Sequence, residues 1–129
     1  MPPTPCPCTS GKSYKNCCGP LLDRSTTAKT AKQLMRSRYS AYALGGHGDY
    51  LLETWHPDSS GGLTAEVLSE KTLNWQGLTI LNLNQKGNQA TVEFEGSFVD
   101  GDGNPGLHHE VSRFRRVKAK WLYVDGKLE

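Results

Sequence analysis

Four cysteines within the first eighteen residues constrain this chain more than any other feature of its sequence. They are Cys6, Cys8, Cys17 and Cys18, in the spacing C-x-C-x8-C-C. The surrounding residues are rich in proline and show no apolar period that would build a helix or a strand core. Something other than hydrophobic burial must therefore order this segment.

A metal ion explains the cysteines better than disulfide bonds do. Bonds within Cys6/Cys8 or Cys17/Cys18 would close small strained rings, and cross-pairing would require an oxidising compartment. The start of the chain lacks the charged and apolar regions of a secretory signal, which predicts a reducing cytoplasm. Four thiolates close a tetrahedral zinc site without leaving a catalytic position open. We predict one structural zinc ion per chain, with iron as the second candidate metal.

The residues around the cysteines suit such a site. Lys12 and Lys15 offset the negative charge of four thiolates, and Gly19-Pro20 is expected to terminate the metal-binding segment. Pro5 to Gly19 resembles the SEC-C motif found in the C-terminal tail of the bacterial secretion motor ATPase SecA. In that family the cysteines bind zinc, and the tail contacts a secretion chaperone and the ribosome. The resemblance implies a zinc-dependent docking module.

Basic residues are concentrated in the N-terminal third, although the net charge is only +2. Up to Gly46 a single acid, Asp23, accompanies seven bases: Lys12, Lys15, Arg24, Lys29, Lys32, Arg36 and Arg38. This asymmetry suggests an anionic partner such as RNA or the ribosome, and Lys12, Tyr14 and Lys15 are the candidate partner-binding residues. The alternative is that the bases solvate a helix face. We expect no DNA sequence recognition. We also expect no membrane span, because no run approaches ~18 apolar residues.

Helical periodicity characterises residues 25 to 69. Between Ser25-Thr26-Thr27, which offers N-cap hydroxyls, and Gly45-Gly46, side chains recur at three- and four-residue spacing. The recurring residues are Ala31, Leu34, Met35, Arg38, Tyr39 and Tyr42. The pattern predicts one long helix, and shorter helices are expected at Asp49–Trp55 and Thr64–Ser69.

Beyond Leu73 the period becomes two, which is typical of strands. Strands are expected at Trp75–Asn84, Gln89–Val99, Leu107–Val117 and Lys120–Val124. Helices followed by an antiparallel meander predict an α+β fold in which the sheet curls over the long helix. The face of the second strand that carries Val92, Phe94, Gly96 and Phe98 should contact that helix.

Most of the remaining chain resembles the bacterial YchJ family. The resemblance rests on Leu34–Tyr42, Tyr50–Pro57, Glu110–Phe114 and Trp121–Gly126. That family joins a SEC-C knuckle to a domain similar to nuclear transport factor 2, which is a cone of curved antiparallel sheet around a long helix. The resemblance implies a SEC-C zinc-binding knuckle at residues 1–22 and a nuclear transport factor 2-like domain at residues 23–129.

Cone-shaped domains often open into a pocket, where inward polar residues bind ligands or transfer protons. The candidate pocket residues are Arg38, Tyr42, His56, Glu110 and Ser112. Arg38 and Glu110 should meet inside the cone, and a buried ion pair is favoured over catalysis because no nucleophile or dinucleotide motif is present. His56 is more simply interpreted as a turn residue.

The sequence leaves three functions open. An adaptor would dock through its knuckle on a protein or on the ribosome, an enzyme or small-molecule binder would use the cone, and an RNA-binding protein would use the basic residues. The knuckle and the basic N-terminal third favour the adaptor, and we assign no catalytic residue. His108 and His109 would need a third ligand to bind a metal.

Overall fold

The computed structural model describes residues 4–128 and has the predicted α+β architecture. Its helices are the 3-10 helix η1 (Tyr14–Asn16) and the α-helices α1 (Gly19–Leu22), α2 (Ala31–Leu44), α3 (Gly48–Glu53) and α4 (Ala65–Leu68). Its strands are β1 (Asn74–Lys86), β2 (Gln89–Val99), β3 (Pro105–Val117) and β4 (Lys120–Leu128), which form an antiparallel meander in that order. Within residues 4–128, no helix has the length and apolar character needed to cross a bilayer.

Several helix boundaries differ from the predicted ones: α3 is Gly48–Glu53 instead of Asp49–Trp55, and α4 is Ala65–Leu68 instead of Thr64–Ser69. Helix α2 begins at Ala31 because Thr30, rather than a residue of Ser25–Thr27, is its N-cap and accepts a hydrogen bond from the Gln33 amide at 3.1 Å. The Gly19-Pro20 pair, predicted to end the knuckle, also opens the short helix α1, which was not predicted, since proline suits the first turn of a helix.

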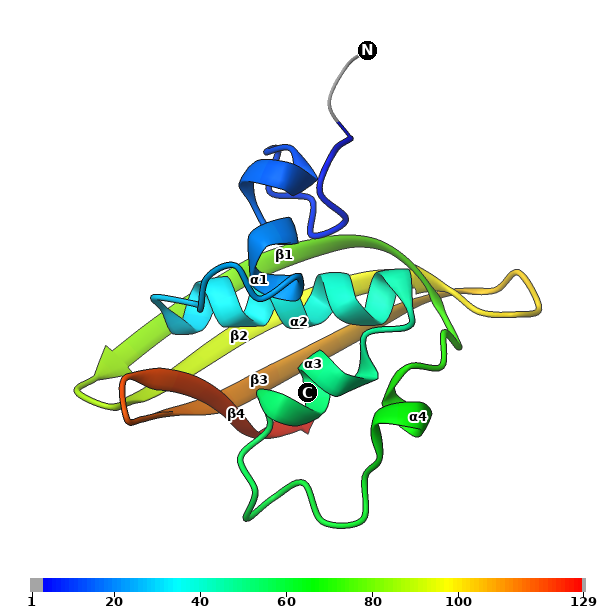
Figure 1. The fold of residues 1–129 in the computed structure, drawn as a ribbon. Coiled ribbons are helices and arrows are strands. Elements are labelled where there is room, and N and C mark those ends of the chain that lie inside the picture. Colours follow the sequence, from blue (N-terminus) through cyan, green and yellow to red (C-terminus); the bar gives the residue numbers. More distant parts are fainter. Residues whose placement is uncertain (1–3, 129) are drawn as a thin grey trace.

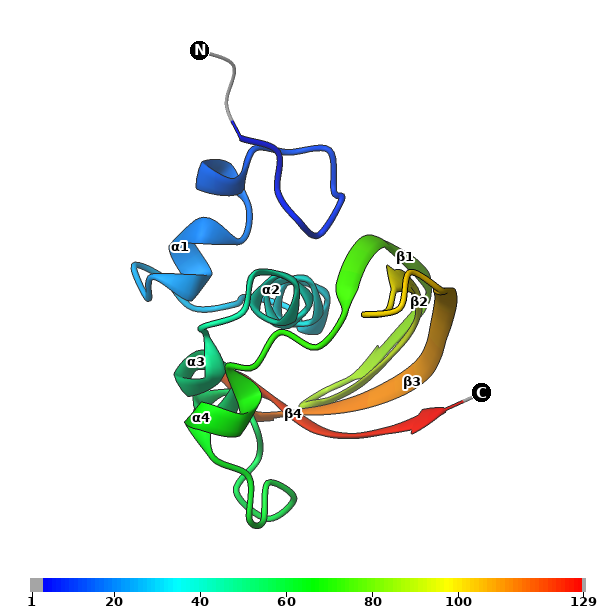
Figure 2. The ribbon, with the colours of Figure 1, turned by 90° about the vertical axis from the view of Figure 1, so that its right-hand side faces the viewer.

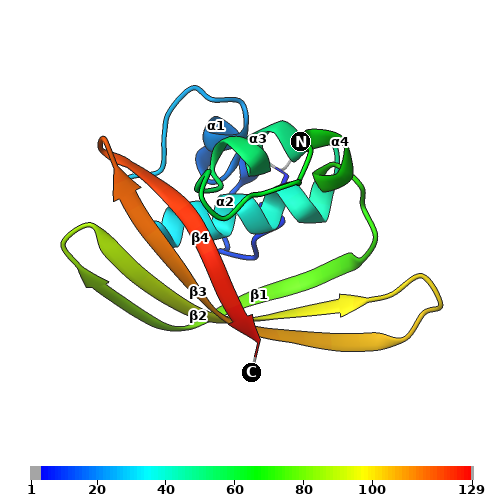
Figure 3. The same cartoon turned by 90° about the horizontal axis from the view of Figure 1, so that it is seen from below.

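The sheet curves around α2 and forms one wall of a cone (Figures 1 and 2). Irregular pairing in β1, between Trp75 and Gly77 and between Ile80 and Asn82, accompanies this curvature. Figure 3 shows β4 crossing beneath the helical layer, so that the sheet's concave face is turned toward α2. The second strand presents the predicted face, because Val92 and Phe94 are buried.

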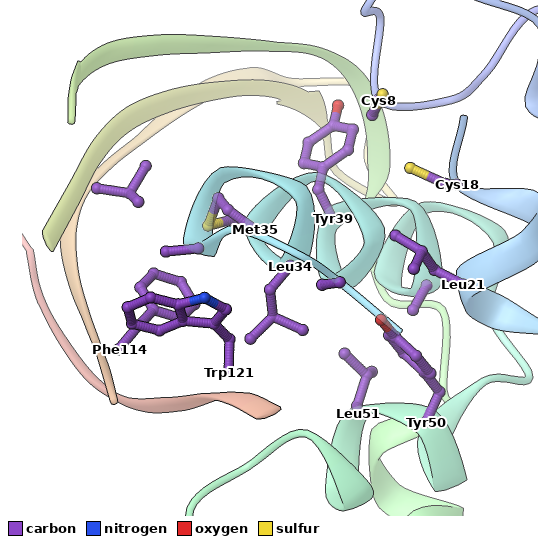
Figure 4. Packing of buried hydrophobic residues seen from close by; sticks show 14 of the residues in the cluster. Cys8, Cys18, Leu21, Leu34, Met35, Tyr39, Tyr50, Leu51, Phe114 and Trp121 are labelled. Carbon is purple, nitrogen blue, oxygen red and sulfur yellow. The ribbon is translucent and has the colours of Figure 1, made fainter. Parts of the chain in front are cut away.

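One hydrophobic core runs from the knuckle through α2 to the sheet (Figure 4). Its residues come from four parts of the chain: the knuckle with α1 (Cys8, Cys18 and Leu21), α2 (Leu34, Met35 and Tyr39), α3 (Tyr50 and Leu51) and the sheet (Phe114 and Trp121). The predicted boundary after residue 22 falls at the end of α1, and burial continues across it. Helix α2 is therefore packed on both sides, by the knuckle and by the sheet.

Candidate metal centre and cone cavity

The four cysteines converge on one point of the knuckle. Their Sγ atoms lie within 4.8 Å of one another, with Cys8 and Cys17 separated by 3.6 Å and Cys17 and Cys18 by 3.9 Å. All four are free thiols. A tetrahedron of sulfurs ~2.3 Å from a central ion has edges of roughly 3.8 Å. The arrangement is therefore compatible with a single metal ion bound by four thiolates.

Local backbone geometry brings the two cysteine pairs together. The loop after Cys8 turns through left-handed conformations at Thr9 (φ 58°) and Gly11 (φ 89°), and the Cys6 amide then donates to the Lys12 carbonyl at 3.0 Å. The Thr9 hydroxyl fixes this loop to β1, since it donates to the Leu78 carbonyl at 3.1 Å and accepts from the Leu78 amide at 3.0 Å. The knuckle is thus attached to the sheet by residues that bind no metal.

Helix α2 supplies groups that contact the cysteines from outside the cluster. The Ser40 hydroxyl lies 3.7 Å from Cys6 Sγ, and Arg36 donates to the Cys8 carbonyl at 3.0 Å with its Nη1 3.7 Å from Cys8 Sγ. Sequence reasoning missed both residues. The one available signal was Ser40 itself, a polar residue that directly follows Tyr39 on the buried side of an amphipathic helix.

Protons are unequally shared within the cysteine cluster. The hydrogen bond with Cys18 is the main cause that lowers the pKa of the Cys8 thiol, and the same contact raises the pKa of Cys18. Thiolates are the metal-binding form of cysteine, so an incoming ion must displace the protons that the other thiols retain.

Replacing Ser40 with alanine is expected to lower metal affinity by about 10- to 100-fold, the range typical of lost contacts to metal ligands. Competition with a chromophoric chelator measures this. Ser37→Ala is the matched control, because Ser37 is equally buried on α2 but bonds to the Tyr50 hydroxyl at 2.7 Å rather than to a cysteine. An unchanged affinity in Ser40→Ala would contradict a role for α2 in the metal centre.

The three predicted partner-binding residues have different surroundings. Lys12 and Lys15 are exposed. Tyr14 is partly buried. Its ring packs so closely against Gly19 that a Cβ atom added to this glycine would lie only 3.2 Å from two of the ring carbons. Burial also raises the pKa of Tyr14. Tyr14 therefore packs against the start of α1 instead of presenting a free ring to a partner.

A groove of about 650 Å³ runs between the knuckle, the segment before α2 and the first turns of α2. Its basic lining residues are Lys12, Lys29, Lys32 and Arg36, and among residues 4–128 no Asp or Glu lines it, although the metal-site thiols of Cys17 and Cys18 do. Lys15 does not line it. Bases distant in sequence are thereby placed along one concave surface, hereafter the basic groove.

A second cavity, of about 210 Å³, lies inside the cone between α2 and the sheet. Four of the five predicted pocket residues line it: Arg38, Tyr42, Glu110 and Ser112. His56 does not, because it belongs to a turn in which its Nδ1 accepts from the Asp58 amide at 3.1 Å. The rest of the lining is largely aromatic, so this cone cavity combines apolar walls with a few polar groups.

The expected ion pair between Arg38 and Glu110 is absent from the described residues, where no such contact falls within 4.0 Å. Arg38 Nη1 donates instead to the Leu51 carbonyl at 2.7 Å and to Thr54 Oγ1 at 2.6 Å. The Tyr123 ring lies 4.6 Å from the guanidinium, and its hydroxyl donates to Glu110 at 3.2 Å. Tyr123, which the sequence analysis did not single out, thus connects the two charged residues.

Glu110 is held by donors on the sheet. Its carboxylate bonds to His108 Nε2 at 2.9 Å and accepts from the Ser112 hydroxyl. Burial raises the pKa of Glu110, but these hydrogen bonds outweigh burial and leave the pKa below its ordinary value. His109 bonds to Glu93 at 2.7 Å. The two histidines therefore have separate carboxylate partners and do not share a metal site.

Fold and site together define a four-cysteine knuckle joined to a nuclear transport factor 2-like cone. The chain belongs to the YchJ family, because the family model described as "YchJ, middle NTF2-like domain" matches residues 30–126. The SEC-C motif matches residues 4–20. The predicted family and fold are confirmed.

Relatives and solved structures agree with this assignment. A UPF0225 protein of Serratia proteamaculans is 42% identical, and the match covers 96% of this chain and 83% of that protein. A UPF0225 protein of Streptomyces coelicolor is 39% identical, and the match covers 99% of this chain and 98% of that protein. The solution structure of a SEC-C motif containing protein from Rhodopseudomonas palustris has a TM-score of 0.86 and 40% identity, and covers 95% of this chain and 96% of its own. The crystal structure of a putative Ca/calmodulin-dependent kinase II association domain from Exiguobacterium sibiricum has a TM-score of 0.56 and covers 80% of this chain and 95% of its own. At 17% identity, it shares the fold alone.

Proposed function

We propose that this protein is a cytoplasmic, zinc-dependent adaptor whose basic groove docks on the RNA of the ribosome. The observation that carries the proposal is the groove itself, where four bases line a concave surface to which no Asp or Glu of residues 4–128 contributes. Phosphate groups would neutralise these bases and release counterions, which is the main source of affinity for a nucleic-acid backbone.

Zinc fits the metal centre and supports the groove. The SEC-C match and the sulfur spacing favour a tetrahedral thiolate ion with no open position, so its role is structural. Arg36 lies in the groove and also donates to the Cys8 carbonyl, while Lys12 is carried by the loop between the cysteine pairs. Metal binding would therefore fix the positions of two of the four bases.

The arrangement favours contacts to the RNA backbone over recognition of bases. Lysine acts as a point charge that suits phosphate without fixing its orientation. Tyr14, the aromatic residue of the knuckle, packs against Gly19 and so is not free to stack on a base. We expect docking that depends on charge and little on sequence.

Ribosome co-sedimentation across a salt series tests this proposal. With four phosphate contacts, the logarithm of the binding constant should fall with a slope of roughly −3 against the logarithm of salt concentration. The double variant Lys12→Glu with Lys32→Glu should lose binding while retaining its metal. Lys86→Glu with Lys127→Glu changes the net charge equally at exposed positions outside the groove and should bind like the wild type.

Three outcomes would overturn the proposal. The protein would remain in the supernatant at low salt, the two double variants would bind equally, or binding would persist after the ribosomal RNA had been digested. The last result would indicate an acidic protein as the partner.

A further inference from the structure

The cone cavity contains a buried cation, Arg38, that has no contact ion pair among residues 4–128. Arg38 is only 3% exposed, its Nη1 donates to Leu51 and Thr54, and the Tyr42 hydroxyl is a further hydrogen-bonding neighbour of its guanidinium. A buried charge is costly unless it is paired as well as hydrogen-bonded. The guanidinium carbon lies 5.0 Å from the centroid of the Trp55 ring and 4.6 Å from that of Tyr123, and these two cation-π partners contact each other edge-on with centroids 5.0 Å apart. This packing fixes its position but leaves its charge unpaired.

None of the neighbouring acidic groups neutralises this cation. Burial raises the pKa of Tyr42 and of Tyr123, so both phenols are neutral at pH 7. Among the described residues Glu110 is the one carboxylate that lines the cavity, and it is already engaged by His108, Ser112 and Tyr123. Its charge acts on Arg38 across the cavity, but no carboxylate of residues 4–128 lies within 4.0 Å of the guanidinium, so a bound anion would supply the missing contact pair.

Trp55 contributes ring surface to the cavity wall. Its indole Nε1 has essentially no accessible surface and no hydrogen-bond partner among the described residues, so it faces the packed interior and not the cavity. The donors that a group bound in the cavity can reach are therefore those of the Arg38 guanidinium.

The size and the walls of the cavity limit what binds there. A volume of about 210 Å³ corresponds to roughly seven water molecules at ~30 Å³ each. Apolar surface comes from Trp75, Phe94 and Met35. Glu110 faces the same space with a negative charge, and like charges in a partly buried site repel strongly. A second negative charge on the ligand would therefore be disfavoured.

We propose that the cone cavity binds a small monocarboxylate with an apolar body. The carboxylate pairs with the guanidinium of Arg38, and the apolar body lies against Trp75 and Phe94. Glu110 excludes dicarboxylates. This site is separate from the basic groove and does not depend on the proposed adaptor function.

Benzoate is a suitable probe because it is small, planar and singly charged. In NMR titrations, benzoate should shift the indole signals of Trp55 and Trp75 and leave that of Trp121, which lies outside the cavity, unchanged. Benzamide, its neutral counterpart, should bind at least about tenfold more weakly, since hydrogen bonds to charged groups are the stronger ones. Terephthalate, a dianion, should also bind more weakly than benzoate, because Glu110 repels its second carboxylate.

Two cavity variants distinguish the roles of the charges. Arg38→Met keeps the apolar stem and should abolish benzoate binding, while the relief of the buried charge's desolvation cost offsets part of the stability lost with its hydrogen bonds to Leu51 and Thr54. Glu110→Gln keeps the shape of the side chain and removes its charge, so it should reduce the difference in affinity between benzoate and terephthalate. Arg113→Met, at an exposed position on β3, is the charge-matched control and should bind benzoate normally.

The wild-type titrations decide the proposal even if a variant fails to fold. Equal affinity for benzoate and benzamide, shifts that include Trp121, or no shift of Trp55 and Trp75 would each overturn it. So would normal benzoate binding by Arg38→Met.

Discussion

Removing the metal ion is expected to unfold residues 4–22 while the sheet remains folded. The knuckle has little apolar surface apart from its cysteines, Leu21 and Leu22, and metal binding supplies on the order of 10–16 kcal/mol to isolated zinc-finger peptides. The part of the core that lies between α2, α3 and the sheet contains none of the four cysteines, so it does not depend directly on the metal. The loss of structure should therefore stop at α2, where Arg36 and Ser40 lose their cysteine partners.

Metal analysis and NMR spectroscopy during chelator titration measure this effect. We expect about one zinc per chain, and tetrahedral thiolate absorption bands after substitution by cobalt. Chelation should collapse the resonances of residues 4–22, shift those of Arg36 and Ser40, and preserve those of β2 and β3. Cys17→Ser with Cys18→Ser should reproduce the chelated spectrum. Collapse of the strand resonances, or a brown protein that contains iron and inorganic sulfide, would contradict this prediction.

The elements that the sequence predicted well are those with a strong local signal. Strand β2 was predicted with its observed bounds, Gln89–Val99, because apolar residues alternate throughout it. Strand β4 extends four residues beyond its predicted end at Val124, through Asp125-Gly126-Lys127-Leu128, where the alternation gives no signal. Pairing with β3 holds those residues in the sheet, and pairing is a tertiary effect.

The parts of the site that the sequence did not predict depend on contacts between distant segments. Nothing near Ser40 or Arg36 indicates that the knuckle will lie on their side of α2. The strand period correctly placed Glu110 and Ser112 on the inner face with Phe114, and the helical stripe placed Arg38 opposite them. Neither pattern indicates that Tyr123 of β4 will stand between the two charges, since that depends on an irregular register between β3 and β4 at Arg113 and Phe114.

Replacing Phe114 with alanine is expected to lower the free energy of unfolding by about 3–5 kcal/mol. Phe114 is 2% exposed and is the largest of the fully enclosed side chains. It lies on the sheet side of α2, and its ring packs edge-on against Tyr123 with the centroids 5.7 Å apart. Truncation would remove its transfer free energy and leave a void that the curved sheet closes only in part.

Urea denaturation measures the loss, with Leu107→Ala as the control. Leu107 also lies on β3 but is 61% exposed, so its truncation should change stability by no more than about 0.5 kcal/mol. Because the metal centre contacts α2 through Ser40 and Arg36 rather than through the sheet, Phe114→Ala should retain its metal below the unfolding transition. A loss below about 1 kcal/mol would show that the cone does not depend on this side chain. Release of the metal while the protein is still folded would show that the knuckle and the sheet are energetically coupled through α2, and the knuckle could then report on what the cone cavity binds.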